Sequence, residues 1–180
     1  MPIRNGYFGT GTYYGWNVTG QGFGTAPQNA SQLNSQTSYY GSPWSGLSGN
    51  YFASIYTPGL VRYPGNLTSV QFLVVEPYLN FKIISPQNAQ LYVKIMQGNQ
   101  SIITTHFNTY ENQDPSNASS HFLNASTPIS FLLCQNISIR VVADVVGTLP
   151  TRTQYIAVSD FYQSSTSDMN SDILVNQTYN

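Results

Sequence analysis

A run of alternating residues constrains the fold of this chain more than any other feature. It extends from Asn136 to Gly147. Apolar residues occupy every second position on one side: Ile137, Ile139, Val141, Ala143 and Val145. The residues between them form the more polar side: Ser138, Arg140, Val142, Asp144 and Val146. Successive side chains of a β-strand point to opposite faces, so this period of two predicts a half-buried strand.

A second run, Gln154–Gln163, is rich in β-branched and aromatic residues, which suit a pleated surface. A polar connection, Thr148–Thr153, separates the two runs. We interpret them as a strand pair at the centre of a sheet. Their outward side still carries apolar residues, more than a free surface favours: Val142, Val146, Ile156 and Val158. We therefore expect both faces to be covered, one by an opposite sheet and one by the aromatic N-terminal segment or a neighbouring subunit.

Further strand candidates are short and are separated by Pro, Gly and Asn. They span residues 51–56, 67–76, 79–84, 91–96, 101–110, 121–123 and 127–134. The predicted core faces are Val70, Phe72 and Val74; Leu79, Phe81 and Ile83; and Leu91, Val93 and Ile95. A turn is expected at Gly98-Asn99 and a loop at Glu111–Ala118. No segment shows a helical period, so the pattern predicts an all-β, antiparallel two-sheet sandwich. A single jelly roll of about eight strands is preferred over an immunoglobulin-like sandwich.

The composition divides the chain into three parts. Residues 1–50 are rich in Gly, Tyr and Asn and are predicted to be an extended arm, packed on their own domain or on a neighbouring subunit. A disordered low-complexity tail is the alternative for this part. Residues 51–163 form the predicted jelly roll. Residues 164–180 form a polar C-terminal tail, in which Ile173–Val175 either adds one edge strand or pairs with another subunit.

Low charge limits the classes of partner. Only 7% of the residues are charged and the formal net charge is -1. Ordinary soluble domains have roughly 25% charged residues. The chain has no basic patch to neutralise phosphates, so we expect no direct contact with nucleic acid. A surface made polar by amides and hydroxyls has a charge that changes little with pH. This fits a protein in an acidic external setting, and it equally fits an extracellular protein that meets no acid. No apolar window approaches ~20 residues, and Met1–Gly6 has no apolar run typical of a signal peptide.

No pattern of catalytic or metal-binding residues is present. The sequence lacks a GxSxG motif, a phosphate-binding glycine loop and zinc spacing. His106 and His121 are interpreted as structural or surface histidines, and Cys134, the single cysteine, as a buried, inert thiol. Asp168–Asp172 and Asn112–Asp114 resemble calcium loops only weakly and are expected to be solvated turns. We therefore predict no catalytic residue, no cofactor and no metal, and a protein that is not an enzyme.

Eight asparagines begin an N-x-[ST] sequon. Seven are candidates for N-glycosylation: Asn17, Asn29, Asn66, Asn99, Asn117, Asn124 and Asn176. Asn136 is a poorer candidate because it heads a predicted core strand.

The composition and strand count of residues 51–163, together with the aromatic-glycine arm, resemble the single jelly-roll capsid proteins of icosahedral archaeal viruses of the portoglobovirus type. The resemblance implies a capsid subunit of a thermoacidophilic archaeal virus, made in the host cytoplasm without a signal peptide and located in the virion. Its implied partners are copies of itself, other structural subunits, covalent N-glycans and an internal membrane or lipid layer.

Two other functions remain open. One is a secreted filament subunit, similar to archaeal pilus or thread proteins, that completes its neighbour's sheet by strand exchange. The other is a carbohydrate-binding module, because Gln154–Phe161 resembles the closing strand of jelly-roll sugar-binding domains. Trp16 and Trp44 are expected in the arm and not on a sheet, which counts against a carbohydrate-binding module.

Overall fold

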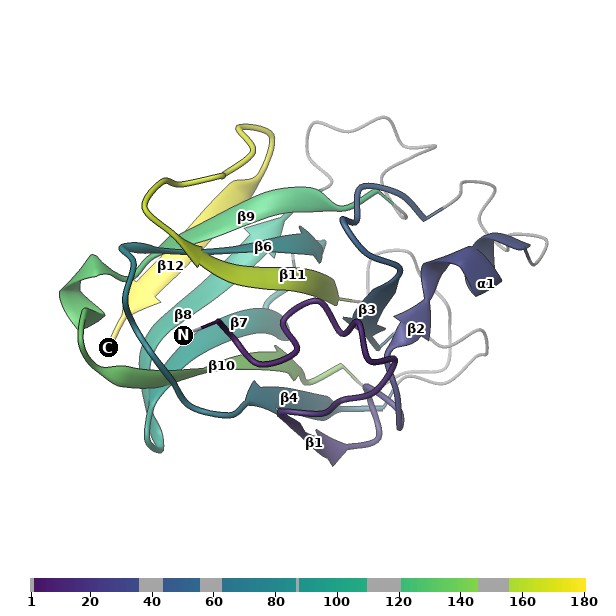
Figure 1. The fold of residues 1–180 in the computed structure, drawn as a ribbon, viewed down its shortest axis with the longest axis horizontal. Helices are drawn as coiled ribbons and strands as arrows, with labels where there is room; N and C mark the ends of the chain where they lie inside the picture. The colour runs from purple at the N-terminus through teal and green to yellow at the C-terminus, as the bar shows by residue number, and fades with distance from the viewer. Residues whose placement is uncertain (1, 36–43, 56–62, 87, 110–120, 146–155) are drawn as a thin grey trace.

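The structure, a computed structural model, describes residues 2–35, 44–55, 63–86, 88–109, 121–145 and 156–180. The predicted loop at 111–118, the connection at 148–153, and the residues Val146 and Asn117 lie outside these ranges. The described part is nearly all β-structure, arranged in two packed layers (Figure 1).

Eight strands form one long hairpin that is rolled up. They are β3 (Tyr51–Ser54), β4 (Gly65–Ser69), β6 (Tyr78–Ile84), β7 (Leu91–Gln97), β8 (Gln100–Asn108), β9 (Leu123–Pro128), β10 (Asn136–Ala143) and β11 (Ala157–Ser164). The hairpin turns at Gly98, whose φ of 58° suits glycine. Outward from this turn, β7 pairs with β8, β6 with β9, β4 with β10, and β3 with β11, all antiparallel.

Successive pairs of this hairpin alternate between the two sheets. One sheet contains the order β4-β10-β7-β8 and the other the order β3-β11-β6-β9 (Figure 1). This is the wrapping of a jelly roll, in which a folded double strand closes around one core. The predicted all-β, antiparallel sandwich is confirmed.

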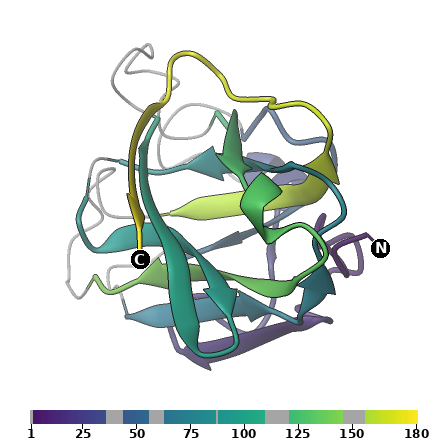
Figure 2. The same ribbon diagram turned by 90° about the vertical axis from the view of Figure 1, so that its left-hand side faces the viewer.

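Additional strands extend both sheets at their edges. β1 (Trp16–Gly20) pairs with β4, β2 (Gln28–Asn29) pairs with β3, and β5 (Phe72–Leu73) pairs with β10. β12 (Leu174–Tyr179) pairs with β8, which confirms the predicted edge strand in the C-terminal tail (Figure 2). The short helix α1 (Ala30–Ser35) follows β2 and was missed by the sequence patterns. None of the helices described is long and apolar enough to cross a membrane.

The N-terminal segment, residues 2–24, fills the side of the sandwich instead of extending from it. In Figure 1 it runs as a coil between β11 and the β10-β4 side of the other sheet. Phe8 and Phe23 are fully buried, and the Trp16 ring lies 5.3 Å from Phe8 and 5.2 Å from Phe161. The boundary predicted at residue 50 is therefore not a break in the packing. Whether residues 51–163 fold without this segment remains a prediction.

A glycine allows this close approach. The Phe161 amide donates a hydrogen bond to the Gly6 carbonyl at 3.0 Å. A Cβ on Gly6 would clash with the Phe161 carbonyl oxygen. The N-terminal backbone thus bonds directly to β11, where that strand has a bulge between Ser159 and Tyr162.

The predicted core faces of three strands are confirmed. The inward residues of β6, β7 and β10 are all buried: Leu79, Phe81, Ile83, Leu91, Val93, Ile95, Ile137, Ile139, Val141 and Ala143. Val142, Ile156 and Val158 are buried as well, so apolar residues on the second face are covered as expected. However, the prediction that residues 136–147 and 154–163 form a strand pair is wrong. β10 and β11 lie in opposite sheets, because each pairs with an earlier strand of the rolled hairpin.

The prediction of one strand over residues 67–76 is wrong. The chain forms β4 and β5 with a break at Val70 and Gln71. Leu67 and Ser69 are buried before the break, Phe72 and Val74 after it, and Val70 itself is 43% exposed. The break shifts the alternation by one residue, and the Val70 amide bonds to the Gly15 carbonyl instead of to a neighbouring strand.

The strand predicted over residues 127–134 is also wrong. β9 ends at Pro128, and a single 3-10 turn, η1 (Ser130–Leu132), follows. Ile129 and Leu132 are buried three residues apart, the spacing of one turn, whereas Phe131 is exposed. Cys134, predicted to be buried, is exposed and has a φ of 63°. The apolar residues from Ile129 to Cys134 thus form a turn and an exposed patch, and they do not form a core strand.

Candidate functional site

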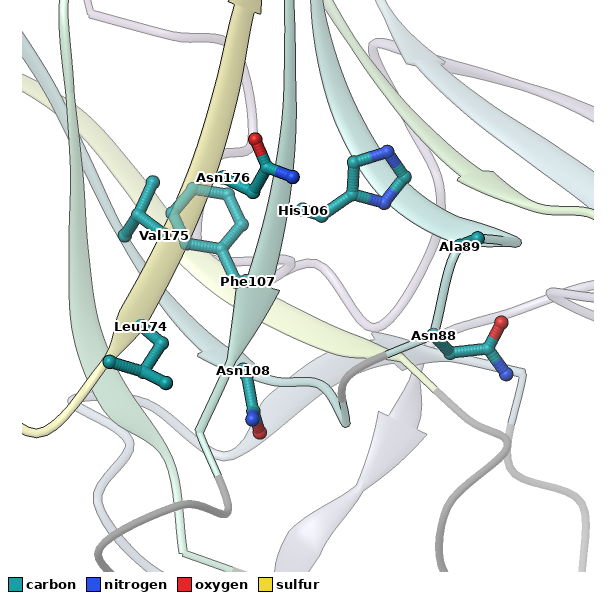
Figure 3. A pocket seen from close by; sticks show the side chains of 8 residues that line it. All are labelled: Asn88, Ala89, His106, Phe107, Asn108, Leu174, Val175 and Asn176. Atoms are coloured by element: carbon teal, nitrogen blue, oxygen red, sulfur yellow. The ribbon is translucent and has the colours of Figure 1, made fainter.

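A cavity of about 410 Å³ lies at the edge of the larger sheet, between β8, β12 and the segment that precedes β7. Eight residues line it: Asn88, Ala89, His106, Phe107, Asn108, Leu174, Val175 and Asn176 (Figure 3). None of these side chains is acidic, Lys or Arg. The cavity is therefore lined by amides, one imidazole and apolar groups.

Strand pairing assembles this lining. In the β8-β12 register, Asn176 lies opposite His106 and Leu174 lies opposite Asn108, so these four side chains share one face of the sheet. Val175 lies opposite Phe107 on the other face. In Figure 3, His106 lies on the side of β8 that faces the segment carrying Asn88 and Ala89. The cavity thus depends on contact between residues that are far apart in the sequence.

The hydrogen bond of His106 fixes the direction of its ring. Its Nδ1 lies 3.2 Å from the Leu91 carbonyl oxygen, which can only accept, so Nδ1 carries the hydrogen. The other ring nitrogen, Nε2, is then an acceptor when the imidazole is neutral. The ring also contacts Tyr92, with 5.2 Å between the ring centroids.

Two amides supply donors and acceptors. The Asn88 side-chain oxygen accepts from the Gln90 amide at 2.8 Å, which holds the Asn88 side chain in place. Asn176 is exposed and makes no side-chain hydrogen bond to any residue that the structure describes. An amide offers both NH₂ donors and a carbonyl acceptor, so Asn176 can bond a hydroxyl in either direction.

A group of polar and charged side chains continues from the cavity across the outer face of the same sheet. The Tyr92 hydroxyl donates to Asp144 at 3.0 Å, and the Lys94 Nζ lies 5.2 Å from the centre of the Tyr92 ring. Burial raises the pKa of Tyr92, and its hydrogen bond to the Asp144 carboxylate raises it further. The phenol therefore remains a protonated donor at neutral pH.

The other candidate residues from the sequence do not converge. His121 is exposed, and its Nδ1 lies 2.9 Å from the Ser45 hydroxyl. Asp168 accepts from the Tyr162 hydroxyl at 3.0 Å, and Asp172 lies in a separate turn closed by Asn170. No group of three metal-ligating side chains occurs within the ranges described, and Asn112–Asp114 lies outside them.

The sequon asparagines differ in exposure. Asn17, Asn99, Asn136 and Asn176 are exposed, whereas Asn29, Asn66 and Asn124 are half-buried. Asn29 is already engaged, since its side-chain oxygen accepts from the Gln32 amide and from Asn50. Asn117 lies outside the described residues. Glycosylation remains a prediction, and at Asn176 a glycan would obstruct the cavity.

The two tryptophans serve the core. Trp16 lies in β1, not in a separate arm, and points inward. Trp44 packs 4.6 Å from Phe52 and 6.1 Å from Phe122. Neither ring is a free platform on the surface.

Two lining residues were singled out from the sequence in other roles: His106 as a structural or surface histidine and Asn176 as a glycosylation candidate. Asn88, Ala89 and Asn108 were not singled out. The only available signal was the Ile173–Val175 run, which predicted an edge strand. It did not indicate that β8 was the partner of that strand, so the cavity was not foreseeable from the sequence.

No protein-family model matches the chain, and no curated protein matches it. Among solved structures, the chain is similar to the carbohydrate-binding module TmCBM61 in complex with β-1,4-galactotriose. That similarity has a TM-score of 0.55 and 14% identity, and it covers 89% of this chain and 94% of the other. This likeness supports the β-sandwich fold.

Two further structures match less closely. The enzymatically active domain of tailspike protein 4 from bacteriophage CBA120 has a TM-score of 0.45 and 13% identity, over 98% of this chain and 21% of that one. The C-terminal extracellular domain of Mycobacterium tuberculosis EmbC has a TM-score of 0.40 and 14% identity, over 62% of this chain and 41% of that one.

Proposed function

We propose that this protein binds an oligosaccharide in the cavity between β8 and β12, without altering it chemically. The single observation that carries the proposal is the lining of the cavity, which combines amides and an imidazole with apolar side chains. Such a set of a few directed polar groups in an apolar surround is typical of small-molecule sites.

The chemistry of the lining suits a sugar. A sugar hydroxyl both donates and accepts, and the cavity offers an acceptor at His106 Nε2 and both kinds of group at Asn176. The C–H faces of a sugar ring are apolar and match Leu174 and Ala89. The volume of about 410 Å³ falls within the roughly 300–1,000 Å³ that is usual for ligand sites.

The fold likeness supports the same class of ligand. TmCBM61, which is similar to this chain over most of both lengths, was solved with a bound galactotriose. The likeness does not transfer a site, so the position of the proposed site rests on the cavity alone. That the chain is not an enzyme remains a prediction.

The test is binding of a panel of neutral di- to tetrasaccharides, β-1,4-galactotriose among them, measured by calorimetry on the full chain. Asn176→Ala and His106→Ala are expected to weaken binding at least tenfold, since each loses a directed hydrogen bond. Asn99→Ala is the matched control, because it removes another exposed amide, at the β7-β8 turn and away from the cavity. Absence of binding to the whole panel, or equal loss in the control, would overturn the proposal.

A second candidate function is a self-assembling structural subunit, in particular the capsid subunit predicted from the sequence. The observation that favours it is an uncharged outer border of the larger sheet. β12 is the last strand of that sheet as described, and five of its six residues are exposed. Tyr179, the last residue of β12, lies 5.9 Å from Phe131 between ring centroids, and the two side chains are 57% and 51% exposed. Uncharged edge strands are templates for pairing between chains.

Electron microscopy and native mass spectrometry test this second function. Closed shells that dissociate in a Phe131→Lys, Tyr179→Lys double variant would support a capsid subunit. Fibres would favour the filament alternative, and a monomer at high concentration would contradict both. Location in a virion and contact with a lipid layer remain predictions of the same hypothesis.

A further inference from the structure

We propose that the oligosaccharide is acidic, and that its carboxylate or sulfate group binds between Lys94 and Arg140 on the outer face of the larger sheet. This inference rests on the proposed carbohydrate function and extends its site from the cavity across the neighbouring strands.

The strand register brings the two cations together. Lys94 on β7 lies directly opposite Arg140 on β10. Their neighbours along each strand, Val93, Ile95, Ile139 and Val141, are buried in the core, so Lys94 and Arg140 share the outer face. In Figure 1, β10, β7, β8 and β12 follow one another across this sheet.

Neither cation is neutralised by the protein in the part of the chain described. No ion pair joins either of them to a described carboxylate. Asp144, which follows β10 directly, accepts the hydrogen bond of the Tyr92 hydroxyl. Like charges directly opposite each other destabilise a sheet. In a chain with only six Lys and Arg residues, placing two of them in this position indicates a role for an external anion.

Each of the two side chains has one defined contact: Arg140 with Thr68 on β4, and Lys94 with Tyr92 on its own strand. Arg140 is half-buried, and its Nε donates to the Thr68 hydroxyl at 3.1 Å, which leaves the remaining N–H groups of the guanidinium for a ligand. The Lys94 ammonium lies over the Tyr92 ring at 5.2 Å. A guanidinium and an ammonium together match the several oxygens of a carboxylate or sulfate.

The cation pair is continuous with the cavity. The Tyr92 ring of β7 contacts the His106 ring of β8, with 5.2 Å between their centroids, and His106 lies opposite Asn176 on β12. Neighbouring strands are about 4.8 Å apart, so the path straight across from Asn176 on β12 reaches Val142 on β10 after three spacings, or about 14 Å. Arg140 lies two residues further along β10, roughly 7 Å from that line. A linear oligosaccharide lying across the strands would contact the amides and imidazole at one end and the cations at the other.

The experiment compares matched ligands on the full chain by calorimetry at low and high salt. The probes are the neutral oligosaccharides of the panel, the same sugars oxidised at C6 to uronates, and the same sugars carrying sulfate. The variants are Lys94→Gln and Arg140→Gln. Lys82→Gln is the control, because Lys82 is also half-buried but lies on β6 of the opposite sheet.

The expected result is that an acidic ligand binds at least tenfold more tightly than its neutral counterpart at low salt. Lys94→Gln and Arg140→Gln should remove this advantage, high salt should reduce it, and Lys82→Gln should retain it. Tighter binding of the uronate or of the sulfated sugar shows which of the two acidic groups the site takes.

Other outcomes separate the two proposals. Equal affinity for neutral and acidic sugars in the wild-type chain would overturn this inference and leave the carbohydrate function standing. If Lys82→Gln weakened binding of the acidic sugar as much as the other two variants do, the preference would come from the net charge of the protein. That result would also overturn this inference. If no sugar of either kind binds, both proposals fail.

Discussion

The N-terminal segment and the C-terminal strand β12 flank the same jelly roll in opposite ways. Both are polar in composition and nearly uncharged. The N-terminal segment buries Phe8 and Phe23 in the core, whereas β12 has no buried residue and lies on a sheet edge. The two flanks have similar polarity but differ in burial: aromatic rings anchor the first in the core, and strand pairing alone holds the second. A change in the first segment should affect folding, and a change in β12 should affect binding.

Phe8→Ala should have the largest effect. The Phe8 ring is fully buried and packs against Tyr13 and Trp16, so its removal leaves a cavity. We expect a loss of about 3–5 kcal/mol in the free energy of unfolding, measured by denaturant titration. Tyr7→Ala, at a neighbouring exposed residue, should change it by less than about 0.5 kcal/mol. A small effect of Phe8→Ala would mean that the segment is only loosely attached.

Gly6→Ala should have the next largest effect, because the new methyl group meets the Phe161 carbonyl oxygen. Pushing the segment away from β11 should cost about 1–3 kcal/mol, measured in the same titration. Gly9→Ala is the matched control, since no atom lies within 4 Å of the added Cβ. Equal effects of the two substitutions would contradict the close contact.

Tyr13 should make stability depend on alkaline pH. Burial raises the pKa of Tyr13 above its ordinary value of 10.0. Below pH 10 the phenol is protonated in both folded and unfolded chains, and its contribution is fully present. Above pH 10 only the unfolded chain ionises, so stability should fall by about 1.4 kcal/mol per pH unit until the folded pKa is reached.

Tyr13→Phe sharpens this test. It removes the hydrogen bond from the Tyr13 hydroxyl to the Phe23 carbonyl and should cost about 1 kcal/mol at neutral pH. Thermal unfolding at several pH values should then show a weaker alkaline decline than in the wild-type chain. An unchanged decline would assign it to other tyrosines.

Leu174→Ala should have the smallest effect on stability. Leu174 begins β12 and is 48% exposed, so its truncation should change the free energy of unfolding by less than about 0.5 kcal/mol. Because Leu174 lines the cavity, sugar affinity should fall while stability does not. If Leu174→Ala lowered stability without weakening sugar binding, β12 would serve the fold and not the site.

The sequence predicted those parts of the fold that local alternation determines. In β6, β7 and β10 the inward positions could be assigned residue by residue, and the hairpin turn at Gly98 was visible, although some alternate positions, such as Asn80 and Ser138, are buried as well. The break at Val70 and the turn at Ile129–Leu132 were not, because apolar runs have the same appearance in strands and in tight turns. The partners of β10 and β11 were not predictable either, since pairing depends on distant strands. The candidate site shared this limit, because β12 reaches β8 only in the folded chain.

The rolled hairpin also sets the order in which the molecule can fold. Only the β7-β8 pair joins residues close in sequence, such as Ile95 and Ile103, and each later pair spans a longer loop, up to Ala53 with Val158. Pairing should therefore spread outward from Gly98, and the reliance on distant contacts predicts slow folding. During synthesis Gly6 emerges long before its backbone partner, Phe161. Phe8 and Trp16, which pack toward Phe161, then remain without this contact until β11 has been made, and exposed apolar surface at that stage favours aggregation.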